Sequence, residues 1–166
     1  GAFNRNGIGI ATTGDGLLRI RRSRDGAALY HAPISVDADR PVWLVVEISS
    51  WHLEGEPNEA LRFGISHGTT AAEGLADIRL QRIDDSTIHI EGRGHGRGAT
   101  RIAAQPLFSN PRTDPLTLAL EVDPAENRYR IYFRESGSGW MLLGDGLTNR
   151  ERLPNQVRLN VANRFN

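Results

Sequence analysis

The sequence contains no cysteine. Without a thiol, the chain cannot carry thiolate catalysis, a disulfide or a cysteine-based metal site. Lysine is absent as well, so all twenty basic residues are arginine, and twenty acidic residues balance them. A chain without net charge has no overall field that would attract nucleic acid or an anionic membrane. These absences exclude several chemistries and predict that nucleic acid is not a partner.

Long apolar runs are also missing. No stretch approaches the roughly 20 residues that span a bilayer, and no signal peptide or lipidation motif is visible, so we predict no membrane insertion. Hydrophobic residues nevertheless make up 39% of the 166 residues. That content is enough for a continuous core in one domain of ordinary size. We expect residues 1–166 to form a single domain, as one module of a larger protein.

What the sequence does contain is a series of short alternating runs separated by turns. Eighteen glycines and eight prolines punctuate the chain, which is typical of many short strands rather than long helices. Between residues 116 and 122, leucine and valine alternate with threonine, alanine and glutamate, so one face of this run is apolar. Eleven runs are predicted as strands, starting near Leu17, Ala28, Val42, Leu61, Leu75, Thr87, Thr100, Leu116, Arg128, Gly139 and Val157. Together they predict an all-β fold, an antiparallel two-sheet β-sandwich or jelly roll.

The order of these runs resembles a known family. The strands PVWLVVEI and LRFGIS, the hairpin LTLALEVDPAENRYRIYF and the closing GWMLLGDGLTNRERLPNQVRLNVANRF are similar to the concanavalin A-like lectin/glucanase superfamily, including its laminin G-like relatives. The resemblance is one of pattern and runs from about Leu17 to Phe165. It implies two curved sheets with a concave face that commonly binds glycans. It implies no particular activity, because this fold serves lectins, carbohydrate-binding modules, glycosidases, lyases and adhesion domains alike.

The stretch EVDPAE, residues 121–126, has the carboxylate spacing of the glucanase motif. A retaining glycosidase needs two carboxyl groups about 5–5.5 Å apart, and in that motif they lie on one strand. Here Pro124 cannot donate to a strand ladder, and it suits the second position of a type I turn. Asp123 and Asn127 are also typical turn residues. We therefore predict the tip of a β-hairpin and assign no catalytic residue.

The stretch IHIEGRGHGRG, residues 88–98, is the most unusual part of the sequence. If it is extended, its polar residues share one face, and arginine forks there would match a carboxylate or sulfate. Those polar residues are His89, Glu91, Arg93, His95 and Arg97. Because so many glycines weaken a strand, we favour a glycine-rich hairpin loop over the extended alternative.

A metal site is not defined by any spacing in the sequence. His89 and His95 would need further ligands that cannot be identified from the sequence. Calcium is frequent in this fold and would need several oxygen ligands from acid-bearing loops. Calcium is therefore the one cofactor we consider, and we assign no ligand to it.

Exposed aromatic rings are the other expected feature of a sugar-binding protein, because the apolar face of a pyranose stacks on a flat ring. Trp51 and Trp140 are candidates, with core packing as the alternative for both. Trp43 lies within a strand and is predicted to belong to the core. The candidate ligand-binding residues are Trp51, His52, Arg62, Arg79, Gln81, His89, Glu91, Arg93, Tyr132 and Trp140.

The leading hypothesis is a non-catalytic carbohydrate-binding, lectin-like domain of a secreted or cell-surface bacterial protein, such as an adhesin or a polysaccharide-processing enzyme. Its partners would be a glycan or polysaccharide and other domains of the same chain. The alternatives are a polysaccharide lyase or glycoside hydrolase on the same fold, and a structural spacer. A lyase would pair Arg79 or Gln81, to neutralise a uronate, with His89 or Tyr132, to move the proton. Whether the protein is an enzyme is left open.

Overall fold

A computed structural model describes most of the chain. The described residues are 8–12, 18–22, 28–37, 39–53, 60–96, 100–102, 107–148 and 152–162. The strands within them are β1 (Ile8–Thr12), β2 (Leu18–Arg22), β3 (Ala28–Pro33), β4 (Val42–Ile48), β5 (Ala60–Ser66), β6 (Gly74–Arg82), β7 (Thr87–Gly94), β8 (Arg101–Ile102), β9 (Leu107–Ser109), β10 (Leu116–Asp123), β11 (Arg128–Glu135), β12 (Met141–Leu147) and β13 (Gln156–Ala162). The one helical segment in these ranges is a 3-10 turn, η1 (Ala71–Glu73).

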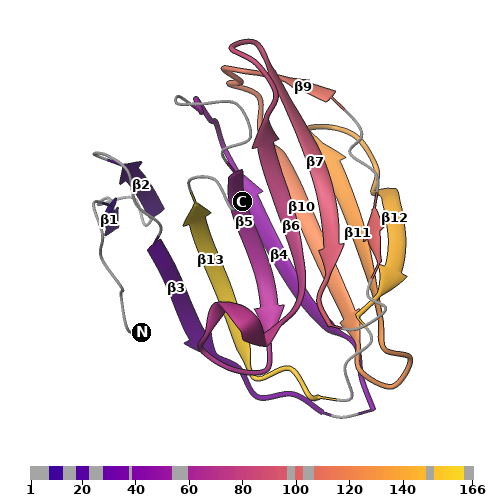
Figure 1. Ribbon diagram of the computed structural model, residues 1–166. Helices are drawn as coiled ribbons and strands as arrows, with labels where there is room; N and C mark the ends of the chain where they lie inside the picture. The colour runs from indigo at the N-terminus through magenta and orange to yellow at the C-terminus, as the bar shows by residue number, and fades with distance from the viewer. Residues whose placement is uncertain are drawn as a thin grey trace.

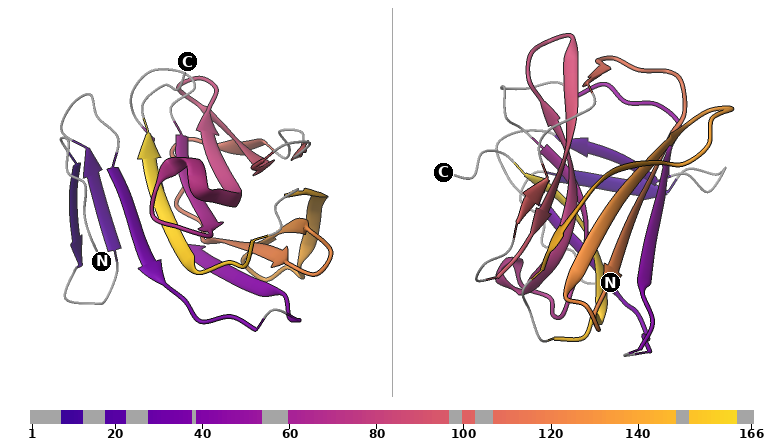
Figure 2. Two further views of the ribbon diagram at one scale, coloured as in Figure 1. Left: turned by 60° about the horizontal axis from the view of Figure 1, so that its bottom comes forward. Right: turned by 90° about the vertical axis from the view of Figure 1, so that its right-hand side faces the viewer.

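Two antiparallel sheets pack face to face. Among the described residues, the large sheet has the strand order β3-β13-β5-β6-β7-β8, with β9 also paired to β7, and the small sheet has the order β12-β11-β10-β4. In the described part of the chain, β1 and β2 pair only with each other. In Figure 1 the strands β10 and β11 lie behind β6 and β7, and Figure 2 shows the two layers from two further directions. The predicted all-β, antiparallel two-sheet sandwich is confirmed.

The core lies between the sheets and follows from the alternation along each strand. On β10 of the small sheet, Leu116, Leu118 and Leu120 are fully buried. On the large sheet, Ile78 of β6 and Ile90 of β7 are equally buried. Burying one such side chain stabilises the fold by roughly 1.5–3 kcal/mol. The intervening residues of each strand therefore point to the outer faces, where the candidate sites lie.

All eleven predicted runs overlap strands of the structure. Strands β1 and β9 were not predicted. Strand β9 spans only three residues, too few for an alternating pattern to be recognised. Between β5 and β6 the chain forms the short helical turn η1.

The hairpin predicted at residues 121–126 is confirmed. Strand β10 ends at Asp123, whose side-chain oxygen accepts hydrogen bonds from the amides of Ala125, at 3.0 Å, and Glu126, at 3.2 Å. Asn127 adopts the left-handed conformation, with φ of 50°. Strand β11 then begins at Arg128. The acids therefore lie around a chain reversal rather than along one strand.

The loop favoured for residues 88–98 is wrong over most of its length, because β7 continues to Gly94. The glycines serve close packing of the two sheets. A Cβ atom on Gly94 would lie 2.2 Å from the carbonyl oxygen of Leu147, and one on Gly92 would lie 2.4 Å from Ile131. Only glycine fits at position 94, where the backbones of β7 and β12 meet, whereas at position 92 side-chain tips would have to move. Arg97 lies outside the described residues.

Candidate functional site

The structure divides the candidate residues between the outer faces of the two sheets. Arg62 lies on β5, Arg79 and Gln81 on β6, and His89, Glu91 and Arg93 on β7, all on the outer face of the large sheet. Tyr132 lies on the outer face of the small sheet, on β11. Trp140 immediately precedes β12, and Trp51 and His52 follow β4. The candidates thus form two separate surfaces.

The first surface is built by the register of the large sheet. Arg62, Arg79 and Glu91 lie directly opposite one another on β5, β6 and β7. In the next row, Asp77 lies opposite Arg93, which in turn lies opposite Arg101 of β8. Residues opposite one another across an antiparallel pair share a face and are close enough to interact. The arginine surface is defined here as Arg62, Arg79, Arg93 and Arg101 with Asp77 and Glu91.

A buried carboxylate organises the arginine surface. The Glu91 side chain is fully buried, and its Oε1 atom accepts a hydrogen bond from Arg79 Nη1 at 2.9 Å. Arg101 donates to the other carboxylate oxygen. The Arg79 side chain is only 10% exposed. Two arginines therefore share the negative charge of Glu91. Because Glu91 and Arg79 are both buried, removing one of these two would leave the other as a costly unpaired charge.

Asp77 is the second buried carboxylate of this surface. Its Oδ2 atom lies 2.5 Å from His95 Nε2, and its Oδ1 atom lies 3.7 Å from Arg79 Nε. Burial raises the pKa of Asp77, but the hydrogen bond to His95 and the positive charges of His95, Arg79 and Arg62 outweigh burial and lower this pKa overall. A general acid needs a raised pKa. The environment of Asp77 therefore stabilises a permanent anion instead of a proton donor.

The lowered pKa of Asp77 predicts acid sensitivity. Its stabilising contribution is fully present above the ordinary value of 3.8 and is lost as the pH falls through the lower folded value. We expect wild type to lose more stability than Asp77→Asn between pH 7 and pH 3, as measured by urea unfolding. Asp37→Asn, at an exposed position paired with Arg40, is the control and should keep the wild-type dependence. Equal losses in Asp77→Asn and wild type would contradict this assignment.

The remaining arginines crowd the same surface. Burial, followed by the charge of Arg79, lowers the pKa of Arg62 to about 10. The nearby charge of Arg93 also lowers this pKa, whereas Asp77 and Glu91 raise it. At neutral pH Arg62 stays protonated, and its lowered pKa reflects burial first and the repulsion of neighbouring cations second.

Gln81 and His89 lie opposite one another at one side of the arginine surface. The His89 Nε2 atom and the Gln81 Oε1 atom are 3.2 Å apart. Burial lowers the pKa of His89, the charge of Glu91 raises it, and that of Arg101 lowers it further. The lowered pKa favours neutral imidazole at neutral pH. Tyr132, the other proton carrier considered for a lyase, lies on the opposite sheet, whereas His89 lies on the same face as Arg79 and Gln81.

Trp51 does not present its ring to solvent, and its prediction as a sugar-stacking residue is wrong. The residue is only 8% exposed. Its indole Nε1 donates a 3.0 Å hydrogen bond to the carbonyl oxygen of Ser109, and its ring meets Phe108 edge-on at 6.1 Å. Arg112 lies over the same ring, with 5.7 Å from the guanidinium carbon to the ring centroid. Trp51 is thus a core residue, whereas the adjacent His52 is exposed.

Trp43 shows the opposite error, because it was predicted to be a core residue but is 51% exposed. Its ring stacks on Tyr132, with 5.4 Å between centroids and 29° between planes. Nearly every residue of β4 is apolar, so composition does not reveal which face is buried. Glu47 does carry the signal, because residues two and four positions before this exposed charge, Val45 and Trp43, share its face.

Polar groups hold the stacked rings in place. Glu121 of β10 is buried and accepts hydrogen bonds from Arg130 Nη1 at 3.0 Å and from the Tyr132 hydroxyl at 3.1 Å. Burial and the hydrogen bond to Glu121 raise the pKa of Tyr132, and the same carboxylate raises the pKa of Arg130. Tyr132 therefore remains a hydroxyl donor at neutral pH. Its ring is fixed by stacking on one side and by hydrogen bonding at its tip.

A second exposed ring extends this surface. Trp140 is 46% exposed, and the guanidinium carbon of Arg134 lies 4.8 Å from its ring centroid. Arg134 follows Tyr132 on the outward face of β11, so the two aromatic positions belong to one outer face. The aromatic surface is defined here as Trp43, Tyr132 and Trp140 with Glu121, Arg130 and Arg134.

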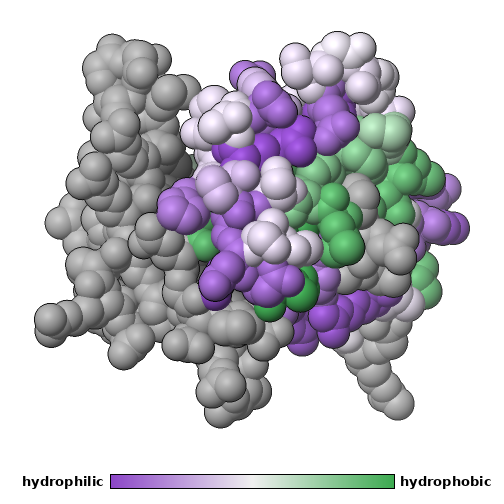
Figure 3. All heavy atoms as spheres, turned by 90° about the horizontal axis from the view of Figure 1, so that it is seen from above, coloured by the Kyte–Doolittle hydropathy of each residue, from purple (hydrophilic) through white to green (hydrophobic). Residues whose placement is uncertain are grey.

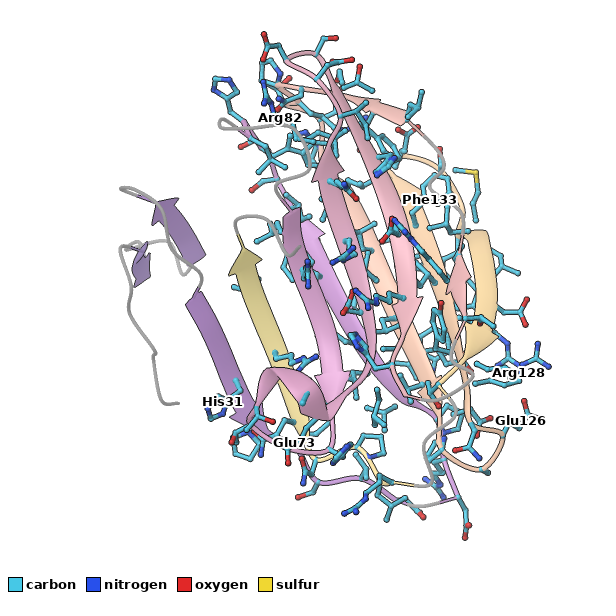
Figure 4. All side chains as sticks on the ribbon, in the orientation of Figure 1. His31, Glu73, Arg82, Glu126, Arg128 and Phe133 are labelled. Carbon is cyan, nitrogen blue, oxygen red and sulfur yellow. The ribbon has the colours of Figure 1, made fainter. Side chains whose placement is uncertain are left out.

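The aromatic surface has apolar neighbours. Val45 and Leu142 are each 56% exposed, and they flank Ala119 and Tyr132 in one row across the small sheet. Viewed from above, hydrophobic residues also gather on the side of the molecule where β9 and β12 lie (Figure 3). Glu126 and Arg128 mark the hairpin end of β11, and Phe133 lies toward its other end (Figure 4). Trp43 lies opposite Glu121, two residues before the end of β10, and is therefore near the hairpin end of the small sheet.

No metal site emerges in the part of the chain that the structure describes, where no group of three or more histidine, aspartate or glutamate residues could hold an ion. In the same ranges, no helix is long and apolar enough to cross a membrane.

Comparisons with known proteins give remote structural likenesses. Neither a protein-family model nor a curated protein sequence matches the chain. The CBM2 module of the evolved Dit of Lactobacillus casei BL23 phage J-1 matches with a TM-score of 0.48 and 8% identity, over 81% of this chain and 59% of that chain. The lectin UEA-II, complexed with galactose, matches with a TM-score of 0.47 and 7% identity, over 96% of this chain and 91% of the lectin. This chain therefore spans less than two thirds of the solved phage chain. Membership of the concanavalin A-like superfamily stays a prediction.

Proposed function

We propose that the protein is a carbohydrate-binding, lectin-like domain that holds a glycan on its aromatic surface. The observation that carries the proposal is the exposed Trp43 ring stacked on the half-buried Tyr132, beside the hydrogen-bonded Glu121 and Arg130. A pyranose ring has an apolar face that stacks on an aromatic ring and a rim of hydroxyls that bond polar groups. The aromatic surface offers both kinds of contact within one face.

Preorganisation supports the same proposal. Tyr132 is fixed at its hydroxyl by Glu121, and Arg130 is held by the same carboxylate. A ligand that binds rings already held in place loses less side-chain entropy on binding. Trp140, with Arg134 over its ring, would provide a second stacking position. Such a surface suits a protein that binds a glycan without catalysing a reaction. As the sequence led us to expect, the domain would belong to a secreted or cell-surface bacterial protein with further domains.

The enzyme alternatives receive less support from the described residues. Asp77 and Glu91 are buried partners of arginine and histidine side chains, and Glu121 is held by Arg130 and Tyr132. A glycosidase needs one carboxyl group that carries a proton and a second that attacks or activates water. Carboxylates neutralised by neighbouring cations are poorly suited to the first role.

Truncation of the Trp43 ring tests the proposal. An array of neutral and acidic oligosaccharides, with calcium and with EDTA, would identify a bound glycan, and calorimetry would give its affinity. We expect Trp43→Ala to weaken that affinity by about tenfold or more, because truncating a central aromatic residue at a binding surface costs about 2 kcal/mol or more.

Leu107→Ala is the matched control, because Leu107 is 65% exposed on β9 of the other sheet. This variant should bind as wild type does. The proposal is overturned if no glycan binds in either buffer, or if Trp43→Ala binds as tightly as wild type. A wild-type dimer that becomes a monomer in Trp43→Ala, as measured by light scattering, would instead identify the aromatic surface as a contact between copies of the chain.

A further inference from the structure

The large sheet carries a second surface whose chemistry differs from that of the aromatic surface. We propose that the arginine surface binds an anionic group, a sulfate or a uronate carboxylate, carried by a glycan. The glycan carrier rests on the proposed function, whereas the anion site itself is argued from the arginines. The surface lies on β5, β6, β7 and β8, on the opposite side of the core from Trp43 and Tyr132.

The first argument is the balance of charge. Within the described residues, the arginine surface has four guanidinium groups and two carboxylates. Glu91 is shared between Arg79 and Arg101, and Asp77 is engaged by His95 and Arg79. The chain as a whole is neutral. An excess of two positive charges is therefore concentrated in this group of residues, and the rest of the neutral chain carries an equal negative excess.

The second argument is the placement of the charges. Arg62 lies directly opposite Arg79, and like charges in this position destabilise a strand pair. The neighbouring cations Arg79 and Arg93 contribute to the lowered pKa of Arg62. A bound anion would relieve this repulsion, because an opposite charge among the arginines favours their charged form. The sheet thus bears an electrostatic cost that a ligand of the right charge would remove.

The third argument is accessibility. Arg93 is exposed, Arg62 is half-buried, and the Arg101 side chain is 62% exposed. Arg79 is held below them by Glu91. In Figure 4, Glu73 just before β6 and Arg82 at its end mark the two ends of β6, the strand that carries Asp77 and Arg79.

At the Glu73 end, the residues around η1 cover part of the large sheet. Arg158 of β13 lies beneath them and donates a 2.9 Å hydrogen bond to the carbonyl oxygen of Thr70. The anion site is therefore assigned to the part of the sheet beyond this cover, around Arg62 and Arg93.

The chemistry of the surface favours a glycan anion over nucleic acid. The planar fork of arginine matches carboxylate and sulfate oxygens with paired hydrogen bonds. Single-stranded nucleic acid is held by aromatic side chains on which bases stack. The outward positions described on β5, β6 and β7 carry arginine, aspartate, glutamate, glutamine, histidine and small residues, and no phenylalanine, tyrosine or tryptophan.

Binding of matched polymers tests the inference. The probes are dextran sulfate, dextran of equal length and an oligogalacturonate, which carry sulfate, no charge and carboxylate, respectively. We expect wild type to bind at least one charged probe at least tenfold more tightly than dextran, and binding to weaken with added salt. Arg62→Ala/Arg93→Ala should weaken it by at least about tenfold.

Three further variants make the test specific. Arg40→Ala removes an arginine that is 81% exposed and lies outside the arginine surface, so it should leave binding unchanged. Arg93→Ala alone changes one exposed side chain and replaces the double variant if that one does not fold. Trp43→Ala should still bind the charged probe as wild type does, but it should bind the neutral glycan of the proposed function more weakly. The two measurements separate failure of this inference from failure of the proposed function. Equal affinity for all three probes, or full binding by the folded arginine variants, would overturn the anion site.

Discussion

Glu91→Ala is expected to lower the free energy of unfolding by about 3–5 kcal/mol. The reason is the position of its partner. The Arg79 side chain is 10% exposed and receives its closest charge compensation from Glu91 at 2.9 Å. Removing the carboxylate would leave this guanidinium buried beside Arg62 and Arg93, with the more distant Asp77 as its remaining anion. Urea unfolding monitored by circular dichroism measures the loss.

Glu47→Ala is the matched control, because Glu47 is exposed on β4 and lies outside the network. It should change stability by no more than about 0.5 kcal/mol. Arg79→Met/Glu91→Leu removes both partners and should be more stable than Glu91→Ala, because no buried charge is then left alone. If Glu91→Ala behaves like Glu47→Ala, or if the double variant is the less stable of the two, the buried charge is not the source of the cost.

The Glu91 network also explains why the arginine surface stays ordered despite its repulsion. The strand register places Arg62 opposite Arg79, and the neighbouring carboxylates Asp77 and Glu91 offset the repulsion between them. Two buried acids fix the inner guanidinium, while Arg93 and Arg101 remain exposed above them. The same pattern occurs on the small sheet, where buried Glu121 fixes Tyr132 and leaves Trp43 exposed. On each face a buried carboxylate orients the side chains that a ligand would contact.

The fold was largely predictable from the sequence because its signals are local. Leu116–Val122 alternates strictly, and its structure has one face in the core, as expected. The turn after Asp123 follows from proline and asparagine chemistry within a few residues. Strand β7 was harder to predict, because the reason for its glycines lies on another sheet. The carbonyl group of Leu147, which requires Gly94, is 53 positions further along the chain.

The candidate sites were predictable only in part. The outward side chains of β6 and β7 follow from alternation, and Arg79, Glu91 and Arg93 do share a face. The pairing of strands decides which residues meet, and it placed Tyr132 on a different sheet from His89. Trp43 was expected in the core and Trp51 at the surface, and the structure shows the reverse, also because of how the strands pair and pack. A tryptophan in an all-apolar strand and one just after it look alike in sequence, but their burial depends on what packs above them.

Gly94→Ala is the second substitution with a large expected effect. Its Cβ atom would lie 2.2 Å from the Leu147 carbonyl oxygen and 3.0 Å from Tyr129 Cε1. Backbone cannot move aside as a side-chain tip can, so we expect a loss of about 3 kcal/mol, at the upper end of the usual cost of overpacking. Gly139→Ala is the control, since nothing lies within 4 Å of its added Cβ atom, and it should lie within about 0.5 kcal/mol of wild type. Chemical denaturation gives the free energy of unfolding of both variants. Equal values would contradict the close approach of Gly94 on β7 to the Leu147 carbonyl group on β12.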